Sequence, residues 1–202
     1  MPLEASETQM IKTKRLIIRP LEKKDFKVWR ESRLNGPEQK NVWDLTRRKP
    51  EECTWPFFKK LLQNQNRQRK DDKFYHFTVF ERDSGQIVGG VSLMEVSRAL
   101  SQSAYLGYGI YNSYWGRGYG KEAVSAVINH GFKKLKLHRI EAGIEPINRR
   151  SIMLARSLGL RKEGLKKRAI FLRNKWVDLV MYTATCEDFG IKWAGATNRP
   201  IR

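Results

Sequence analysis

The chain has 202 residues, with 40 Lys and Arg against 21 Asp and Glu, which gives a formal net charge of +19. Its hydrophobic content of 40% and its six tryptophans exclude an intrinsically disordered chain. No apolar run reaches the roughly 18–20 residues that a membrane-spanning helix needs, so none is expected. The length favours one domain with a sizeable core.

The first half of the chain combines short apolar strands with amphipathic helices. Pro20 ends the first strand, and Pro50 with the two glutamates after it suits the first turn of a helix. The segment RDSG joins two apolar runs with residues typical of a hairpin turn. We expect strands at 13–19, 73–81 and 86–96, and helices at 21–34 and 50–69.

The second half alternates strand and helix more regularly. A strand at 104–111 leads into a glycine-rich stretch, and a helix with one apolar stripe follows over about 121–135. A strand at 138–146, a short helix at 148–160 and a last strand at 175–185 complete the pattern. The pattern predicts a mixed α/β domain of the α+β type, with about seven strands and about four helices.

The stretch YNSYWGRGYGKEA, from Tyr111 to Ala123, places glycines at alternate positions just before a helix. Gly116, Gly118 and Gly120 leave the backbone without side chains where the first N–H groups of the helix have no partner. Unpaired N–H groups and the helix dipole both favour an anion there. The stretch therefore predicts an anion-binding loop, although the glycines alone also fit a tight turn between a strand and a helix.

Two nucleotide-binding motifs are excluded at this loop. A P-loop requires Ser or Thr after Gly-Lys, whereas Glu122 follows Gly120 and Lys121 here. The dinucleotide fingerprint GxGxxG is also absent, because this run reads GxGxG. The loop therefore belongs to neither of these classes of nucleotide-binding protein.

The chain resembles the GNAT family of acetyl-CoA-dependent N-acetyltransferases in three successive segments. These segments are YLGYGI, YWGRGYGKEA and HRIEAGIEPINRRSIMLARSLGLRKEG. Within the family the chain is most similar to the RimJ/RimL type, and to RimJ above all, whose members acetylate ribosomal-protein N-termini. The resemblance covers about residues 12–187 and implies a single domain over 1–202, with short tails at 1–11 and 188–202.

The resemblance implies a V-shaped splay between the strands at 104–110 and 138–145, where acetyl-CoA binds. The pyrophosphate is expected on backbone N–H groups of the R/QxxGxG/A loop, in which Trp115 replaces the usual Arg or Gln. The pantetheine arm is expected to pair with the first strand, with the N–H of Ile110 on the thioester oxygen. The implied cofactor-binding residues are Gly109, Ile110, Tyr111, Trp115, Gly116, Arg117, Gly118, Tyr119, Gly120, Lys121, Asn148 and Ser151.

The resemblance also implies catalytic roles. Asn148 is expected on the pantetheine amide and Ser151 near the thiol, as the acid for the departing thiolate, although Asn148 also fits an ordinary helix cap. The glutamate base of RimL relatives falls at Ile170, so that base is absent here. Glu141, Glu145 and Glu95 are the alternative carboxylates. Glu141 and Glu145 share one face of their strand and are the candidate catalytic residues, and each carboxylate also fits an ordinary solvated or ion-paired glutamate.

The leading functional prediction is acetylation of the N-terminal α-amine of a ribosomal protein, with incidental contact to ribosomal RNA. The positive charge suits such docking, because it attracts polyanions, but it is equally consistent with a solvated surface. A second possibility is acetylation of a small amine, such as a polyamine or an aminoglycoside, which the positive charge would repel. A third is a non-catalytic CoA-binding or ribosome-binding module, which the missing glutamate leaves open.

The cysteines and the N-terminal segment bear on metal binding, disulfide formation and secretion. Cys53 and Cys186 show neither CxxC nor Cys/His spacing, which predicts no zinc site and no disulfide framework. The N-terminal MPLEASETQM lacks the basic and then apolar layout of a signal peptide. We therefore expect a cytoplasmic protein without a metal and without a membrane partner, and the sequence leaves the oligomeric state open.

Overall fold

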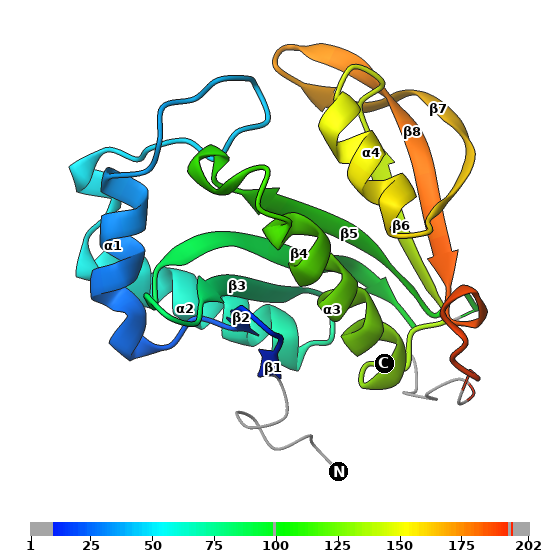
Figure 1. Ribbon diagram of the computed structural model, residues 1–202, viewed down its shortest axis with the longest axis horizontal. Helices are drawn as coiled ribbons and strands as arrows, with labels where there is room; N and C mark the ends of the chain where they lie inside the picture. The colour runs from blue at the N-terminus through cyan, green and yellow to red at the C-terminus, as the bar shows by residue number, and fades with distance from the viewer. Residues whose placement is uncertain (1–9, 99, 194, 196–202) are drawn as a thin grey trace. The chain divides into compact units, whose positions relative to one another are not determined.

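The computed structural model describes residues 10–98, 100–193 and 195 (Figure 1). By its internal contacts the chain divides into two compact units. The first unit runs to Ser92 and adds Tyr108–Val127, and the second comprises Leu93–Gly107 and the chain from Ile128 onward. Among the described residues, no helix is both long and apolar enough to cross a membrane.

Within the described residues, eight strands form one hydrogen-bonded sheet in the order β1-β2-β3-β4-β5-β6-β8-β7, so the mixed α/β fold predicted from the sequence is confirmed. The expected number of about seven strands is close, because the apolar patterns indicated neither β1 nor β7 as a separate strand. The strands are β1 (Ile11–Lys12), β2 (Leu16–Arg19), β3 (Tyr75–Glu81), β4 (Ile87–Ser97), β5 (Ser103–Ile110), β6 (Arg139–Ile144), β7 (Arg161–Leu172) and β8 (Lys175–Thr185). The α-helices are α1 (Phe26–Leu34), α2 (Trp55–Lys70), α3 (Tyr119–Lys133) and α4 (Arg149–Ser157).

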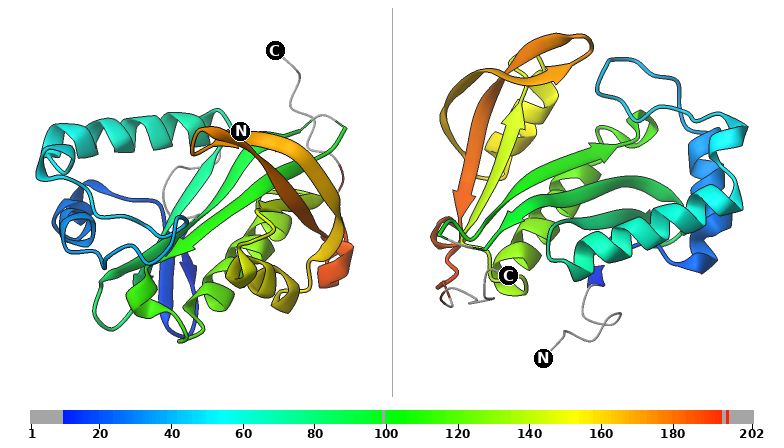
Figure 2. Two further views of the ribbon diagram at one scale, coloured as in Figure 1. Left: turned by 90° about the horizontal axis from the view of Figure 1, so that it is seen from above. Right: turned by 180° about the vertical axis from the view of Figure 1, so that it is seen from behind.

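In the first unit, α1 and α2 pack together through aromatic side chains. The ring of Phe58 lies 4.8 Å from that of Trp29 and 5.4 Å from that of Phe26, measured between centroids. Phe58 is fully buried, and α2 lies against β3 (Figure 2). The same core cluster includes Phe80 of β3 and Ile87 of β4, so it joins the two helices to the sheet.

The second helix begins later than the sequence predicted. Pro50–Glu52 form a separate 3-10 turn, and the extended backbone of Thr54 interrupts the chain before α2 starts at Trp55. Pro56 then occupies the first turn of α2, where its missing N–H costs nothing. The prediction of a start at Pro50 was therefore wrong, because the sequence offers two prolines that both suit a first turn.

In the second unit, β6 pairs antiparallel with β8 over six residues, and β8 pairs antiparallel with β7. Arg173 and Asn174 form the turn of the β7–β8 hairpin, with φ angles of 50° and 60°. Almost every side chain of β7 is exposed, and its pairing is interrupted by two irregularities. The strand lies at the edge of the sheet, with lysines and arginines that discourage pairing with another chain.

β5 and β6 are parallel neighbours over only three residue pairs, from Ser103↔Arg139 to Tyr105↔Glu141. β5 then continues to Ile110 and β6 to Ile144, with no further pair between them in the described part of the chain. β6 keeps its pairing with β8 as far as Ile144. The parallel pairing of β5 with β6 therefore ends at Tyr105.

Candidate functional site

The glycine stretch connects the end of β5 to α3 through a 3-10 turn at Asn112–Tyr114. Gly116 and Gly118 have φ angles of +76° and +77°, a left-handed conformation that residues with a Cβ rarely adopt. Gly120 is already the second residue of α3. The first two glycines are therefore required by backbone conformation, and the loop shape depends on both of them.

The N-terminus of α3 presents backbone donors beside this loop. The first N–H of the helix to bond back along the chain is that of Glu122, which donates to the carbonyl of Gly118 at 3.1 Å. The N–H groups of Tyr119, Gly120 and Lys121 precede it, where helix geometry provides no partner four residues earlier. Together with the helix dipole, these donors suit a phosphate group.

The carboxylate of Glu122 ties this end of α3 to the start of β2. It accepts hydrogen bonds from the hydroxyl of Thr13 at 2.6 Å and from the N–H of Arg15 at 2.9 Å. The guanidinium of Arg15 donates to the same carboxylate at 2.8 Å and to the carbonyl of Arg117 at 2.7 Å. One arginine therefore binds both the loop and the first turn of the helix.

This arrangement favours an ionised Glu122. Burial by itself would raise the pKa of Glu122, but the hydrogen bonds from Thr13 and Arg15 together hold the pKa below its usual value. The side chain is 18% exposed, so its charge is partly shielded from water. An ionised carboxylate in the first turn also stabilises the helix dipole.

The side chain of Tyr119 is buried and bound within the protein. Its hydroxyl donates to Glu81, which raises the pKa of Tyr119, and the residue is 7% exposed. Hydrogen bonds from Ser84 and Tyr119 lower the pKa of Glu81. The guanidinium of Arg15 stacks over the Tyr119 ring at 4.5 Å. Only the backbone of Tyr119 is therefore available to an anion at the loop.

The end of β5 carries the predicted contacts to the pantetheine arm. The N–H of Tyr111 donates to the carbonyl of Val88 on β4 at 2.9 Å, so it is not available to a ligand. The indole of Trp115 donates to the carbonyl of Ile110 at 2.9 Å. Because successive N–H groups point to opposite edges of a strand, the N–H of Ile110 points away from β4. Of these residues, Ile110 therefore offers the backbone donor.

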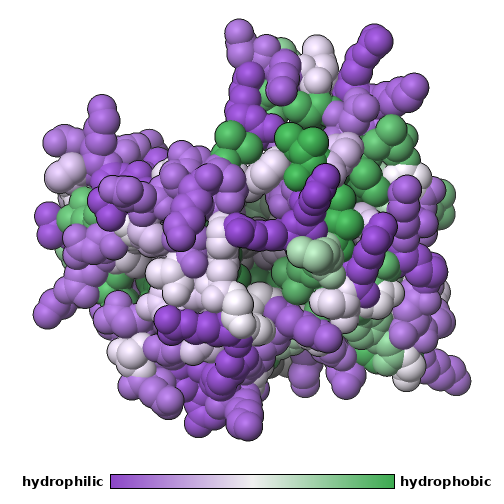
Figure 3. Space-filling model, turned by 45° about the horizontal axis from the view of Figure 1, so that its top comes forward, coloured by the Kyte–Doolittle hydropathy of each residue, from purple (hydrophilic) through white to green (hydrophobic). Residues whose placement is uncertain are grey.

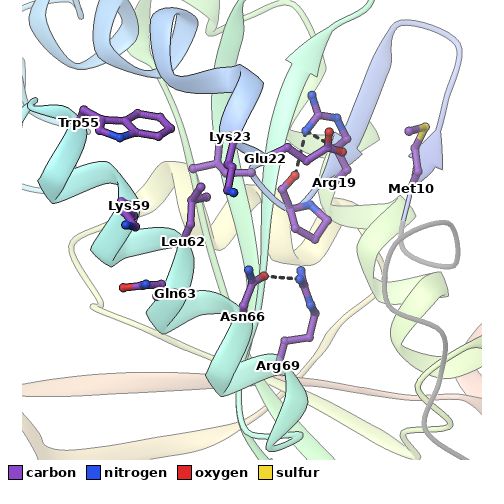
Figure 4. A pocket seen from close by; sticks show the side chains of 12 residues that line it. Met10, Arg19, Glu22, Lys23, Trp55, Lys59, Leu62, Gln63, Asn66 and Arg69 are labelled. Atoms are coloured by element: carbon purple, nitrogen blue, oxygen red, sulfur yellow. Dashed lines mark hydrogen bonds and ion pairs between the residues drawn. The ribbon is translucent and has the colours of Figure 1, made fainter.

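The first unit also contains two pockets. The larger, of about 390 Å³, lies between α2 and the segment after β2, and none of the predicted site residues lines it (Figure 4). Its Arg19 is already held by Asp25, at 2.7 and 2.8 Å, and its Arg69 donates to Asn66. The smaller pocket, of about 220 Å³, includes Tyr111 in its lining.

In the second unit, Asn148 is the N-cap of α4. Its side-chain oxygen accepts a hydrogen bond from the N–H of Ser151 at 3.2 Å. The alternative that the sequence left open for Asn148 is therefore confirmed. The cap uses only the oxygen, so the amide NH₂ group of Asn148 can still donate to a second acceptor.

The two candidate carboxylates are both engaged by arginines. Arg139 donates to Glu141 at 3.0 Å and also binds Glu163. Glu145 is 8% exposed and forms an ion pair with Arg173 at the turn of the β7–β8 hairpin. Neither Glu141 nor Glu145 is a free carboxylate, so the alternative that each is an ordinary ion-paired glutamate fits the structure.

The sequence did not reveal the residues that support the loop. Thr13, Arg15 and Glu81 lie far from the glycine stretch along the chain and only the fold brings them to it. Glu122 was visible in the sequence, but only as the residue that excluded a P-loop. The position of Glu122 in the first turn of the helix, beside three glycines, was a sign that its carboxylate binds a residue from another segment.

Comparison with known proteins agrees with this geometry. The family model described as an acetyltransferase (GNAT) domain matches residues 15–161. The chain belongs to the GNAT acetyltransferase family. Membership of this family supports an acetyltransferase activity and the use of acetyl-CoA, which the glycine loop with its backbone donors fits.

Two curated relatives and one solved structure illustrate the similarity. The chain is 36% identical to the probable N-acetyltransferase YjcK of Bacillus subtilis over 120 residues, which is 59% of this chain and 66% of YjcK. It is 32% identical over 124 residues to the [ribosomal protein uS5]-alanine N-acetyltransferase of Escherichia coli, covering 61% and 64% of the two chains. Each match spans less than two thirds of the relative. The structure of Mycobacterium smegmatis RimJ in complex with CoA-disulfide has a TM-score of 0.72 at 24% identity, over 86% of this chain and 83% of that one.

Substitution of individual glycines tests whether the loop backbone binds acetyl-CoA. Val at position 118 forces a left-handed φ on a β-branched residue and brings its Cβ to 3.4 Å from the Arg15 guanidinium. We expect Gly118→Val to weaken acetyl-CoA binding by at least about tenfold. Gly120→Ala, inside a helix that favours alanine, should bind like the wild type. Isothermal titration calorimetry measures both affinities.

A matched control accounts for strain alone. Gly85 has a similar φ of +68°, with no neighbour near the added Cβ, in the turn after β3. Gly85→Val should lose comparable stability while keeping the wild-type affinity for acetyl-CoA. Equal affinities for the wild type and Gly118→Val would show that the loop does not bind the cofactor.

Proposed function

We propose that the chain transfers the acetyl group of acetyl-CoA to the N-terminal α-amine of a protein, with a ribosomal protein as the acceptor. The observation that carries the proposal is the left-handed glycine loop at the start of α3, which Arg15 and Glu122 hold in place. The relative from Escherichia coli, whose name gives a ribosomal-protein alanine as its substrate, supports the choice of acceptor.

In this proposal the loop binds the pyrophosphate through its backbone. The donors are N–H groups within 116–121, and Arg117 and Lys121 add positive charge near them. Arg117 also stacks on the ring of Tyr114 at 5.5 Å, which restricts where its guanidinium can lie. Trp115 takes a supporting part, because its indole fixes the carbonyl of Ile110. Gly109 packs closely against Leu45, since a Cβ at position 109 would lie 3.1 Å from the Leu45 side chain.

The remaining proposed residues act on the reacting end. Acetyl-CoA supplies the acetyl group as a thioester, whose carbonyl carbon a neutral amine attacks. The N–H of Ile110 is proposed to stabilise the oxygen that gains negative charge. Asn148 is proposed to donate its amide NH₂ to the pantetheine chain. As the C–N bond forms and the C–S bond breaks, Ser151 is proposed to pass a proton to the departing sulfur and to take one back from water, which receives the proton that the amine loses.

The chemistry of an α-amine reduces the need for a base. Such an amine has a pKa of about 8, so a few per cent to about a fifth of it is neutral near neutral pH. The ion pairs of Glu141 with Arg139 and of Glu145 with Arg173 argue that neither carboxylate is indispensable. We propose that Glu141 and Glu145 support the second unit and contribute little as bases.

The surface charge supports a polyanionic environment for the acceptor. The net charge is +19, and the face drawn in Figure 3 is largely hydrophilic. Docking beside ribosomal RNA would release counterions and weaken as salt rises. The same net positive charge would repel a cationic polyamine or aminoglycoside. A small amine is therefore only the second candidate for the acceptor.

A direct assay distinguishes the three functions. The protein is incubated with acetyl-CoA and with peptides that begin with Ala, Ser or Met, and thiol release is followed together with peptide mass. We expect a gain of about 42 Da on the α-amine of at least one peptide. The matched control is the same peptide with a blocked N-terminus and an internal lysine, which should stay unmodified, since a lysine amine has a pKa of about 10.4.

Two outcomes would contradict the proposal. Robust turnover of spermidine or an aminoglycoside, with all peptides unmodified, would favour the small-amine function. Binding of acetyl-CoA without turnover of any amine, including N-termini of intact ribosomal proteins, would favour a non-catalytic module.

Variants of the proposed catalytic groups give a second prediction. We expect Ser151→Ala to lower kcat/KM about a hundredfold, since it removes the proton donor, while Glu141→Gln and Glu145→Gln lower it less than about tenfold. Ser157→Ala is the matched control, because Ser157 lies at the last position of the same helix and its hydroxyl donates to the carbonyl of Leu154. The measurement is kcat/KM against pH for each variant. A loss above about a thousandfold in one glutamine variant, with Ser151→Ala near normal, would identify that glutamate as the base.

A further inference from the structure

Three metal-ligating side chains meet where β6 begins and β8 ends. His138, Cys186 and Glu187 each offer one ligand atom, and these atoms all lie within 4.8 Å of one another. The N–H of Cys186 donates to the carbonyl of His138 at 3.0 Å, which extends the β6–β8 ladder by one residue beyond Arg139↔Thr185. The backbone therefore fixes two of the three side chains as neighbours across adjacent strands.

The three side chains already converge. The imidazole Nε2 of His138 lies 3.3 Å from a carboxylate oxygen of Glu187, and Cys186 directly precedes Glu187 in the chain. The ring of Trp193 packs edge-on against the imidazole, with the ring centroids 5.4 Å apart. Cys186 is 1% exposed, whereas the side chains of His138 and Glu187 are 36% and 56% exposed. The thiol is thus the buried member of the cluster, and the imidazole and the carboxylate are its solvent-exposed members.

The separations suit a tetrahedral zinc ion. Zinc binds nitrogen and oxygen at about 2.0–2.2 Å and sulfur at about 2.3 Å, which places tetrahedral ligand atoms about 3.3–3.6 Å apart. The separation between His138 and Glu187 already falls in this range. The remaining separations require a closure of about 1 Å, which the exposed side chains can supply.

The donor set also selects the class of metal. A thiolate with an imidazole suits zinc or a similar transition metal, whereas magnesium and calcium prefer oxygen ligands throughout. Binding replaces the thiol proton of Cys186, which is released to solvent. The resulting thiolate and the Glu187 carboxylate balance the two charges of the ion, which matters in a chain with a net charge of +19. The nearby Asp188 is engaged by Arg161 and adds no free charge.

We propose that His138, Cys186 and Glu187 bind one zinc ion, with the fourth position open to water. The ion would fasten the start of β6 to the end of β8 and to the 3-10 turn at Glu187–Phe189. Asn148 and Ser151 follow the opposite end of β6, so the ion is a stabilising element and not a part of the proposed catalytic residues. The proposal does not depend on the identity of the acceptor.

Cobalt(II) is the probe of choice, because a cysteine thiolate bound to it gives a strong near-ultraviolet charge-transfer absorption. The untagged full chain is titrated with cobalt chloride and then with zinc chloride. We expect one equivalent of cobalt to produce the band and zinc to abolish it. Zinc should also raise the Tm of the wild type, because a ligand that binds only the folded state stabilises it.

The chain offers a matched control in its other cysteine. Cys53 is also buried, at 0% exposure, but is not part of the cluster. Cys53→Ser should retain the cobalt band and the zinc-dependent rise in Tm, whereas Cys186→Ser should lose both and His138→Gln should bind at least tenfold more weakly. Absence of the band in the wild type, or its loss in Cys53→Ser, would overturn the proposal. Should Cys186→Ser fail to fold, the wild type and Cys53→Ser still decide, because the chain has only two cysteines.

Discussion

The glycine loop depends on one carboxylate. Glu122 accepts hydrogen bonds from Thr13 and Arg15 at the start of β2, and Arg15 also holds the carbonyl of Arg117 within the loop. The left-handed backbone at Gly116 and Gly118 is a conformation that residues with a Cβ rarely adopt. The ion pair of Arg15 with Glu122 therefore helps to hold the loop in this conformation.

This constraint connects the fold to the proposed chemistry. A loop held before the ligand arrives presents its N–H groups without further reorganisation, which is the condition under which fixed dipoles stabilise charge most effectively. The same strand that leads into the loop carries the N–H of Ile110, and its pairing with β6 ends at Tyr105. Family membership and the proposed direct attack of an amine are both consistent with this arrangement.

The sequence predicted features that local patterns encode. Alternate glycines before an apolar stripe gave the loop and α3, and Asn148 three residues before Ser151 gave the cap of α4. β7 escaped prediction because an edge strand rich in Lys and Arg lacks the apolar alternation of a half-buried strand. Contacts between distant segments escaped for a different reason, since neither Arg15 with Glu122 nor His138 with Cys186 has any local signature. The catalytic roles also remain predictions, because they rest on a ligand and not on the folded chain alone.

The central claim is that the preformed loop binds the pyrophosphate of acetyl-CoA through its backbone. Amide signals of the ¹⁵N-labelled protein can be followed by NMR while CoA, and separately pantetheine without the pyrophosphate, is added. The account predicts that CoA shifts the amide signals of Gly116, Gly118, Tyr119, Gly120 and Lys121, and that pantetheine leaves them in place. Saturating CoA that shifts signals elsewhere but leaves these five amides unmoved would contradict it.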